Sequence, residues 1–157
     1  MKKLKITIIA VILLWVSSCA KDDKIFLNDN NYLIFGRYYG MCDGNNCVMT
    51  YKLTGEKLYE DTRHNYLSQN FNFVELAEDK FELAKDLVQY FPAELLDSKD
   101  SIFGCPDCGD QGGLLVRYVK NRKEKTWRID QSKSAIPIYL HHFIDKINET
   151  IFLINDK

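Results

Sequence analysis

The sequence predicts an α+β domain in which an antiparallel sheet, built from two β-hairpins, packs against two amphipathic helices. Two segments, 48–61 and 112–130, are rich in β-forming residues, and each contains a turn signal. Each is followed along the chain by a segment whose apolar residues recur with the period of an α-helix. Because an antiparallel sheet tolerates water on one side, we expect the helices to cover one face and the other face to be wet.

The first strand is expected over residues 31–40 (NYLIFGRYYG), which are rich in β-formers. The next residues, 41–47 (MCDGNNC), are predicted to form a loop, since glycine and asparagine tolerate positive φ. In the hairpin that follows, Met49, Tyr51 and Leu53 alternate on one face, residues 54–56 make the turn, and residues 58–60 form the return strand. Residues 62–76 are expected to be an irregular connection.

A helix is predicted to begin after this connection, where Asp79 and Glu82 fit a capping box. Pro92 should end it, because the residue before a proline is pushed out of the α region. A short helical turn is expected at residues 92–96. The apolar residues at helical spacing are Phe81, Ala84, Leu87, Val88 and Phe91.

The second hairpin, 112–130, is predicted to turn at residues 121–123, and a final helix is predicted to start near Pro137. The inward residues of the hairpin should be Leu114, Val116, Tyr118, Trp127 and Ile129, and the helix stripe should be Leu140, Phe143, Ile144, Ile147 and Ile151. Each half of the chain thus has a cysteine-containing loop, a hairpin and an amphipathic helix. This order suggests a ββα pseudo-repeat, although few residues are identical between the halves.

The N-terminus is typical of a secretory signal peptide. Lys2, Lys3 and Lys5 precede an apolar run of 11 residues that ends at Val16. The run is too short to span a hydrocarbon core of about 30 Å as a helix. A basic front, a short apolar segment and small residues before a cut site together favour a signal peptide over a membrane span.

The end of this run, Val16-Ser17-Ser18-Cys19, resembles the lipobox of bacterial lipoproteins. The resemblance implies that the Cys19 thiol receives a diacylglycerol, that the chain is cut before Cys19, and that the new amine is acylated. Two or three acyl chains meet the requirement of two signals for stable anchoring. Residues 1–18 are therefore expected to be the signal peptide, residues 19–30 a lipidated tether, and residues 31–157 a single α+β domain.

The next residues, Ala20-Lys21-Asp22-Asp23, resemble the export signal of Bacteroidota surface lipoproteins, and the chain is similar to small lipoproteins of that phylum. The resemblance implies attachment to the outer membrane, at the cell surface or on the periplasmic face. The mature chain would carry 18 Lys and Arg against 22 Asp and Glu. Because it is mildly acidic and has no basic block, we expect no nucleic-acid partner.

The four cysteines other than Cys19 lie close together in twos along the chain: Cys42 is near Cys47, and Cys105 is near Cys108. An even number of cysteines in an exported protein favours disulfides, whose connectivity the sequence leaves open. A zinc site with four thiolates is the second interpretation, since Cys-Pro-Asp-Cys resembles a zinc-ribbon knuckle. Redox catalysis is the third interpretation, but a strand rather than a helix is expected after Cys108, so a thiolate there would lack a helix N-terminus to stabilise it.

Other candidate sites have simpler explanations. Asp43, Asp107 and Asp110 could share a Ca²⁺ ion but are better explained as turn formers. His141 and Asp145 lie one helical turn apart, as metal ligands can, but ordinary surface polarity explains them better. Asp100-Ser101-Ile102 resembles the O-glycosylation sequon of exported Bacteroidota proteins, with Ser101 as the acceptor.

No catalytic triad pattern, phosphate loop or HExxH motif occurs, and no cofactor is expected. We therefore expect a lipid-anchored envelope lipoprotein whose domain is a non-catalytic module for a protein or glycan partner. Its candidate surfaces are the wet sheet face and the cysteine loops. The alternative is a thiol-redox or zinc-binding protein that uses Cys105 and Cys108 with Cys42 and Cys47.

Overall fold

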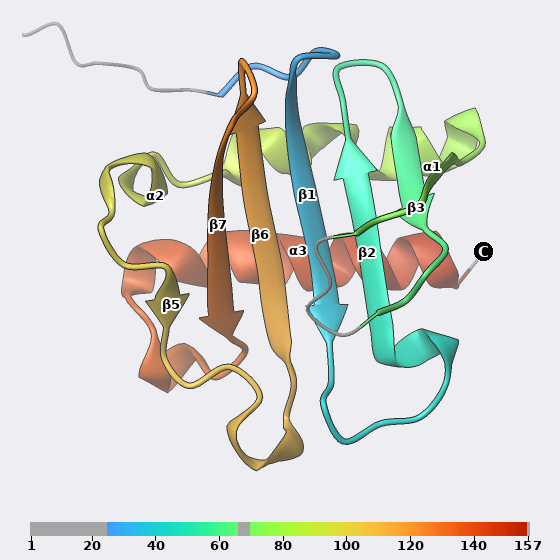
Figure 1. Cartoon of the computed structure of the whole chain (residues 1–157). Helices are drawn as coiled ribbons and strands as arrows, with labels where there is room; N and C mark the ends of the chain where they lie inside the picture. Colours follow the sequence, from blue (N-terminus) through green and yellow to red (C-terminus); the bar gives the residue numbers. More distant parts are fainter. Residues whose placement is uncertain (1–24, 66–69, 157) are drawn as a thin grey trace, which may run out of the picture.

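One seven-stranded sheet forms the centre of the computed structural model, which describes residues 25–65 and 70–156 (Figure 1). The strands are β1 (Asn31–Tyr38), β2 (Val48–Leu53), β3 (Leu58–Asp61), β4 (Phe73–Glu75), β5 (Ile102–Phe103), β6 (Gly113–Lys120) and β7 (Lys123–Asp130). The helices are α1 (Glu78–Ala84), α2 (Glu94–Asp97) and α3 (His141–Asn155), and 3₁₀ turns occupy Asn45–Cys47, Lys85–Tyr90, Cys108–Asp110, Lys133–Ala135 and Ile138–Leu140.

The strand order is β4-β3-β2-β1-β6-β7-β5, and every pair is antiparallel except β5 with β7. The hairpin β2–β3 lies on one side of β1, and the hairpin β6–β7 lies on the other. Strand β1 is paired along its whole length with β6, from Asn31 opposite Lys120 to Tyr38 opposite Gly113. The predicted α+β class and both predicted hairpins are confirmed.

The two halves of the chain each supply a hairpin and then a helix, in the order that the ββα pseudo-repeat expects. They differ in the strand that precedes the hairpin. In the first half, β1 is antiparallel to the first hairpin strand, β2. In the second half, β5 is parallel to the second hairpin strand, β7. The crossover from β5 to β6 therefore has no counterpart in the first half.

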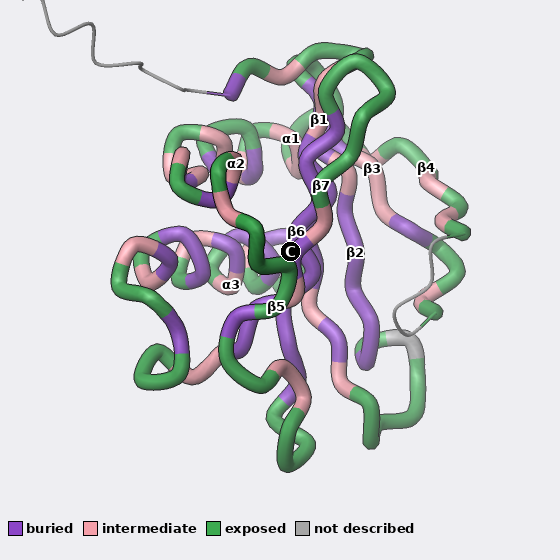
Figure 2. Tube along the Cα trace, turned by 60° about the vertical axis from the view of Figure 1, so that its left-hand side comes forward, coloured by how far each residue is buried: buried purple, intermediate pink, exposed green. Residues whose placement is uncertain are grey.

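The hydrophobic core lies between the sheet and the helices, all of which cover one face (Figures 1 and 2). The half-buried Phe91 packs against this core, and its ring centroid lies 5.4 Å from that of Phe143, 5.8 Å from that of Tyr118 and 5.9 Å from that of Trp127. All the alternating and helix-stripe residues expected to point inward from the two hairpins and the last helix are buried: Met49, Tyr51, Leu53, Leu114, Val116, Tyr118, Trp127, Ile129, Leu140, Phe143, Ile144, Ile147 and Ile151.

The predicted capping box at α1 is wrong. The N-cap is Ala77, which makes no side-chain cap bond, so Asp79 lies inside the first turn. There its carboxylate is near the positive end of the helix dipole. The helix begins this early because the Leu76 amide still donates to the Leu58 carbonyl in the sheet, 2.9 Å away, and the chain turns away at once.

Two short strands fall where the sequence predicts irregular structure. Strand β4 lies inside the expected connection 62–76 and pairs with β3, and β5 has only two residues. Runs this short are below the length at which alternation is informative. The β6–β7 turn is also tighter than predicted. It consists of Asn121 and Arg122, both at positive φ (51° and 66°), as a type I′ hairpin turn requires.

The sheet face opposite the helices is called the helix-free face below, and it is wet only in part. Ile34 and Thr50 point to it and are buried. The connection from β3 to β4 folds over this face, where Phe71 packs against Tyr38, Val48 and Leu115. This corrects the expectation of a wet second face, since an irregular connection can cover a sheet as a helix does.

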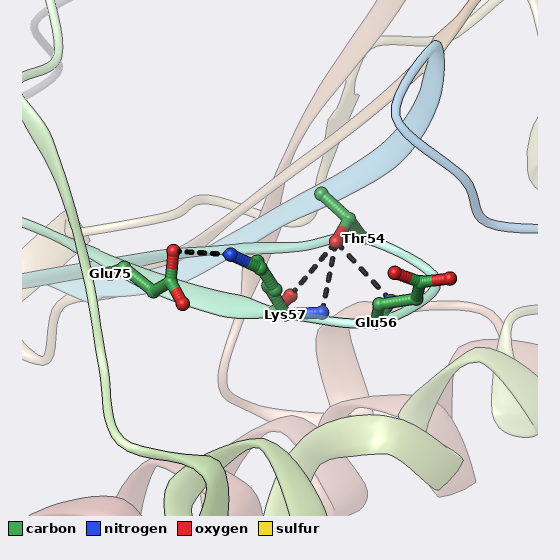
Figure 3. Close-up of polar contacts among 4 residues, drawn as sticks. All are labelled: Thr54, Glu56, Lys57 and Glu75. Carbon is green, nitrogen blue, oxygen red and sulfur yellow. Dashed lines mark hydrogen bonds and ion pairs between the residues drawn. The ribbon is translucent and has the colours of Figure 1, made fainter.

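Polar contacts fix the base of the β3–β4 connection and the β2–β3 turn. The buried Asp61 carboxylate accepts hydrogen bonds from the amides of Asn72 (2.6 Å) and Arg63 (3.3 Å), which closes the base of the β3–β4 connection. At the β2–β3 turn, the Thr54 hydroxyl donates to the Lys57 carbonyl (3.2 Å) and accepts from the Lys57 amide (3.0 Å) (Figure 3). Lys57 also pairs with Glu75 of β4 at 2.8 Å, which fixes the edge strand to the hairpin.

Among the residues that the structure describes, no helix is both long enough and apolar enough to cross a bilayer.

Truncating Phe143 to alanine should lower the free energy of unfolding by about 3–5 kcal/mol, because its ring is fully buried and the cavity would not refill. The matched control is Phe152→Ala on the same helix, whose ring is 61% exposed; it should change stability by about 0.5 kcal/mol or less. Equilibrium urea unfolding with the disulfides intact measures both. Equal losses in the two variants would contradict the assigned core face of α3.

Candidate functional site

The two cysteine loops lie at the same end of the sheet. Tyr38, the last residue of β1, is opposite Val48 on one side and Gly113 on the other, so both loops leave the sheet from one row of residues. They also touch each other. A Cβ on Gly112 would lie 2.4 Å from the Tyr39 ring and 2.6 Å from the Tyr38 carbonyl oxygen, and Gly112 has φ of 74°, so only glycine fits there.

Each cysteine is bonded to its near neighbour in sequence. Cys42 is linked to Cys47 with a Cα–Cα distance of 5.6 Å, and Cys105 to Cys108 with 5.4 Å. The sequence left three connectivities open, and the structure has the local one. Each disulfide closes a small loop, so each stabilises the fold less than a cross-link between the loops would.

The Cys105–Cys108 loop is shaped by its acidic residues. Asp107 is at positive φ (66°), and its carboxylate accepts a hydrogen bond from the Gly112 amide at 3.2 Å. The buried Asp130 accepts from the Cys105 amide at 2.9 Å. The backbone conformation and the hydrogen bond of Asp107 are those of a turn-forming aspartate. After Cys108 the chain makes a short 3₁₀ turn and then enters β6, so the strand expected after the motif is confirmed.

Within the described residues, no group of three or more His, Cys, Asp or Glu side chains could hold a metal ion. The residues considered as ligands have other partners. His141 Nε2 lies 3.3 Å from the Ile136 carbonyl oxygen, and Asp145 pairs with Lys133 at 2.7 Å. Ser101 is exposed just before β5, and its carbonyl accepts from the Arg128 amide at 2.9 Å. An exposed loop position is what an O-glycosylation acceptor requires.

A row of aromatic and cationic side chains runs across the helix-free face, and we call it the aromatic row: Tyr32, Lys52, Tyr59, Phe71, Phe73 and Arg117. Its centre is Lys52 of β2. The Lys52 ammonium lies 4.6 Å from the ring centroid of Tyr32, 5.0 Å from that of Tyr59 and 6.0 Å from that of Phe73. Three strands, β1, β3 and β4, therefore each present one ring to the cation on β2, in the geometry of cation–π contacts.

The aromatic row continues onto β6 through the β3–β4 connection. The rings of Phe73 and Phe71 are 5.0 Å apart, and the Arg117 guanidinium lies 5.5 Å from the Phe71 ring. Arg117 itself is buried, donating to the Thr126 hydroxyl at 2.9 Å and pairing with Glu124 at 3.4 Å. The four rings of the row are only half-buried, so their outer faces are open to a ligand.

The residues of the aromatic row are not among the sites predicted from the sequence. The signal was present as alternation, because Tyr32, Lys52 and Tyr59 occupy the positions between inward-pointing core residues. Aromatic side chains at positions that should face water indicate a face that is covered or that binds. Phe71 and Phe73 could not be assigned, since their segment was predicted to be irregular.

A separate pocket of about 340 Å³ lies where α3 ends against β1 and β2. Arg37 lines it, and its buried Nε has no hydrogen-bond partner among the described residues. Nearby, the Tyr51 hydroxyl accepts from Asn155 at 2.9 Å, and burial raises the pKa of Tyr51 to about 12. Arg37 is beside the C-terminus of α3, where a cation complements the helix dipole, and this accounts for its position.

Cys19, the lipobox and the export signal all lie outside the described residues. The lipid anchor therefore stays a prediction. No protein-family model matches the sequence, and a search of curated proteins gives no significant match.

The local disulfides can be tested by trypsin digestion of the unreduced protein. Residues 38–52 and 100–117 contain no internal Lys or Arg before their last residue, so each cysteine pair should stay within one peptide. Each peptide should be two hydrogens lighter than its reduced form, and alkylation before reduction should add nothing. Peptides 38–52 and 100–117 joined to each other would contradict the structure, and thiols alkylated without reduction would favour the thiolate interpretation.

Proposed function

We propose that the protein is a lipid-anchored envelope lipoprotein whose α+β domain is a non-catalytic binding module, with the ligand on the helix-free face. The observation that carries the proposal is the aromatic row, in which half-buried rings from neighbouring strands surround one lysine. The lipobox at Cys19 supports the anchor, and two disulfides are in keeping with an exported protein.

Rings held by a sheet make a preorganised surface. Lys52, Tyr59 and Tyr32 are on regular strands, so ligand binding needs little ordering of backbone and costs less conformational entropy than binding by a loop. Aromatic side chains also offer a large contact area with few rotatable bonds. These properties favour recognition of a flat partner group over catalysis, which requires a nucleophile or base with a partner.

A glycan is the ligand class that this surface suits best. The C–H faces of sugar rings pack on aromatic rings, while the Lys52 ammonium can donate to hydroxyl or carboxylate groups. Rings on neighbouring strands also extend the contact beyond one sugar unit. A protein ligand is the other partner class, and the binding experiment below separates the two.

Replacing Cys19 with alanine should abolish incorporation of an alkynyl fatty acid supplied to the growing cells, because no thiol is left to receive the diacylglycerol. The matched control is Cys42→Ala with Cys47→Ala, which removes two cysteines elsewhere and should keep full labelling. Click chemistry and gel fluorescence measure the label, and detergent-phase partition measures the anchor. A Cys19→Ala protein that still carries the label would refute the lipobox interpretation.

The double variant Tyr59→Ala with Phe73→Ala should bind a glycan ligand at least about tenfold more weakly, since aromatic anchors dominate binding energies. The intact protein is first screened on a glycan array, and calorimetry then gives the dissociation constants. The control is Phe152→Ala, which removes an exposed ring from α3 and should leave binding unchanged.

Circular dichroism must show that the double variant keeps its fold, because Phe73 belongs to an edge strand. If the double variant binds the glycan with the same affinity as the intact protein, the glycan site is not on the helix-free face. If the intact protein binds no glycan but captures an envelope protein, and the double variant does not capture it, the ligand of this surface is a protein.

A further inference from the structure

The β6–β7 turn concentrates positive charge. Residues 120–125 (KNRKEK) carry four cations and one anion, and all six are exposed. The mature chain is acidic overall, so this cluster is opposite in sign to the rest of the molecule. We call its cations, Lys120, Arg122, Lys123 and Lys125, the basic turn.

The charges of the basic turn have no acidic partner among the residues that the structure describes. Lys120 and Lys123 are directly opposite each other in the β6–β7 ladder, and like charges at such a pair are destabilising. None of the four cations forms an ion pair with another described residue. The one acid of the segment, Glu124, is paired with Arg117 on the other side of the hairpin. A fold that keeps this repulsion can relieve it by binding an anion.

The three lysines of the basic turn line a pocket of about 530 Å³. By burial, Tyr118 and the half-buried Leu96 form its floor, and the exposed lysines form its rim. Asn121 and Glu124 also line the pocket, and the Glu124 carboxylate is paired with Arg117. Lys125 donates a hydrogen bond to the Leu96 carbonyl, which holds its side chain across one side of the pocket. An anionic head with an apolar body fits this combination, because the rim can pair with the charge while the floor accepts methylene groups.

The N-terminal segment leaves the domain beside the same turn (Figure 1). The Asn121 amide lies 3.2 Å from the Asn30 carbonyl oxygen and 3.1 Å from Asn31 Oδ1. Ile25 is buried in the core, whereas Phe26 is 75% exposed. Only five residues separate Cys19 from Ile25, so an acylated Cys19 would keep Ile25 within about 20 Å of the lipid layer in any conformation.

We propose that the basic turn docks onto the anionic headgroups of the lipid layer that holds the anchor, with a headgroup phosphate at the rim of the pocket and Phe26 at the interface. This rests on the proposed lipid anchor, which supplies the proximity. A soluble anion would account for the lysines but not for the exposed ring or for the adjacent anchored segment. Each Lys or Arg near an anionic surface strengthens attachment about fivefold.

The docking also orients the domain. The cysteine loops lie at the opposite end of the sheet from the basic turn, because Tyr38 and Asn31 are the two ends of β1. A strand of eight residues spans about 26 Å, so the loops would be held away from the lipid surface. The aromatic row would then be on the side of the domain and accessible to a ligand.

Lysine footprinting of the native protein in vesicles tests the proposal. The protein is purified in detergent and reconstituted into phosphatidylcholine vesicles with or without 30% phosphatidylglycerol, a composition we choose as the probe, and is briefly acetylated. Mass spectrometry then gives the labelling rate of each lysine. On the anionic vesicles, Lys120 and Lys123 should react several times more slowly than on the neutral ones, by up to about fivefold. Acetylation removes one cation from the surface, and each such cation contributes about a factor of five to attachment. Lys133 and Lys146, on other parts of the surface, serve as internal controls and should react equally on both vesicles.

Two further arms make the result specific. The variant Arg122→Gln with Lys123→Gln should restore the labelling rate of Lys120, whereas the matched variant Lys133→Gln with Lys146→Gln should not. Salt at about 1 M shortens the Debye length to about 3 Å and should also restore it. The same digest reads the mass of the N-terminal peptide and hence the lipidation of Cys19.

The outcomes separate the two proposals. A lipidated protein whose Lys120 and Lys123 react equally on both vesicles would overturn the docking and leave the anchor intact. A protein without acyl chains at Cys19 would overturn the anchor and the docking together. Protection on neutral vesicles by inorganic phosphate alone would assign the pocket to a free anion and would also overturn docking.

Discussion

The pairing of β1 with both of its neighbours is the constraint on which the rest of the structure depends. Its eight residues are bonded to β6, whose partners are about 80 positions further along the chain, and six of them also pair with β2. Without β1, the two hairpins would be separate ribbons of marginal stability. Gly36 allows the close contact on the β2 side, since a Cβ there would lie 2.4 Å from the Met49 carbonyl oxygen.

The alternation of side chains along β1 gives the two faces of the sheet different roles. Leu33 and Phe35 point to the helices and into the core, whereas Tyr32 belongs to the aromatic row on the other face. The ends of the same strand separate two more features, because the cysteine loops leave from Tyr38 and the N-terminal segment enters at Asn31. The register of β1 with its neighbours therefore determines where the proposed ligand surface, the disulfides and the basic turn lie.

Sequence patterns predicted the structure best where a strand or helix is long enough for its hydrophobic period to repeat several times. The alternation of Leu114, Val116 and Tyr118 and the stripe along α3 predicted their buried faces correctly, since burial of a repeated face is a strong local signal. The capping box at Asp79 failed because the tertiary contact between Leu76 and Leu58 decides where α1 begins. The local disulfides were among the alternatives, but spacing alone does not choose between connectivities.

The sequence by itself determined the class of fold, the residues of the core faces and the neighbouring cysteines, because each of these is written in neighbouring residues or in a short period. Only the tertiary structure decided that β5 runs parallel to β7, that Phe71 folds over the helix-free face, and that Lys120 and Lys123 face each other beside the N-terminal segment. These depend on pairings between distant segments. Local periodicity states which side of a strand is buried, but it does not state which strand lies next to it.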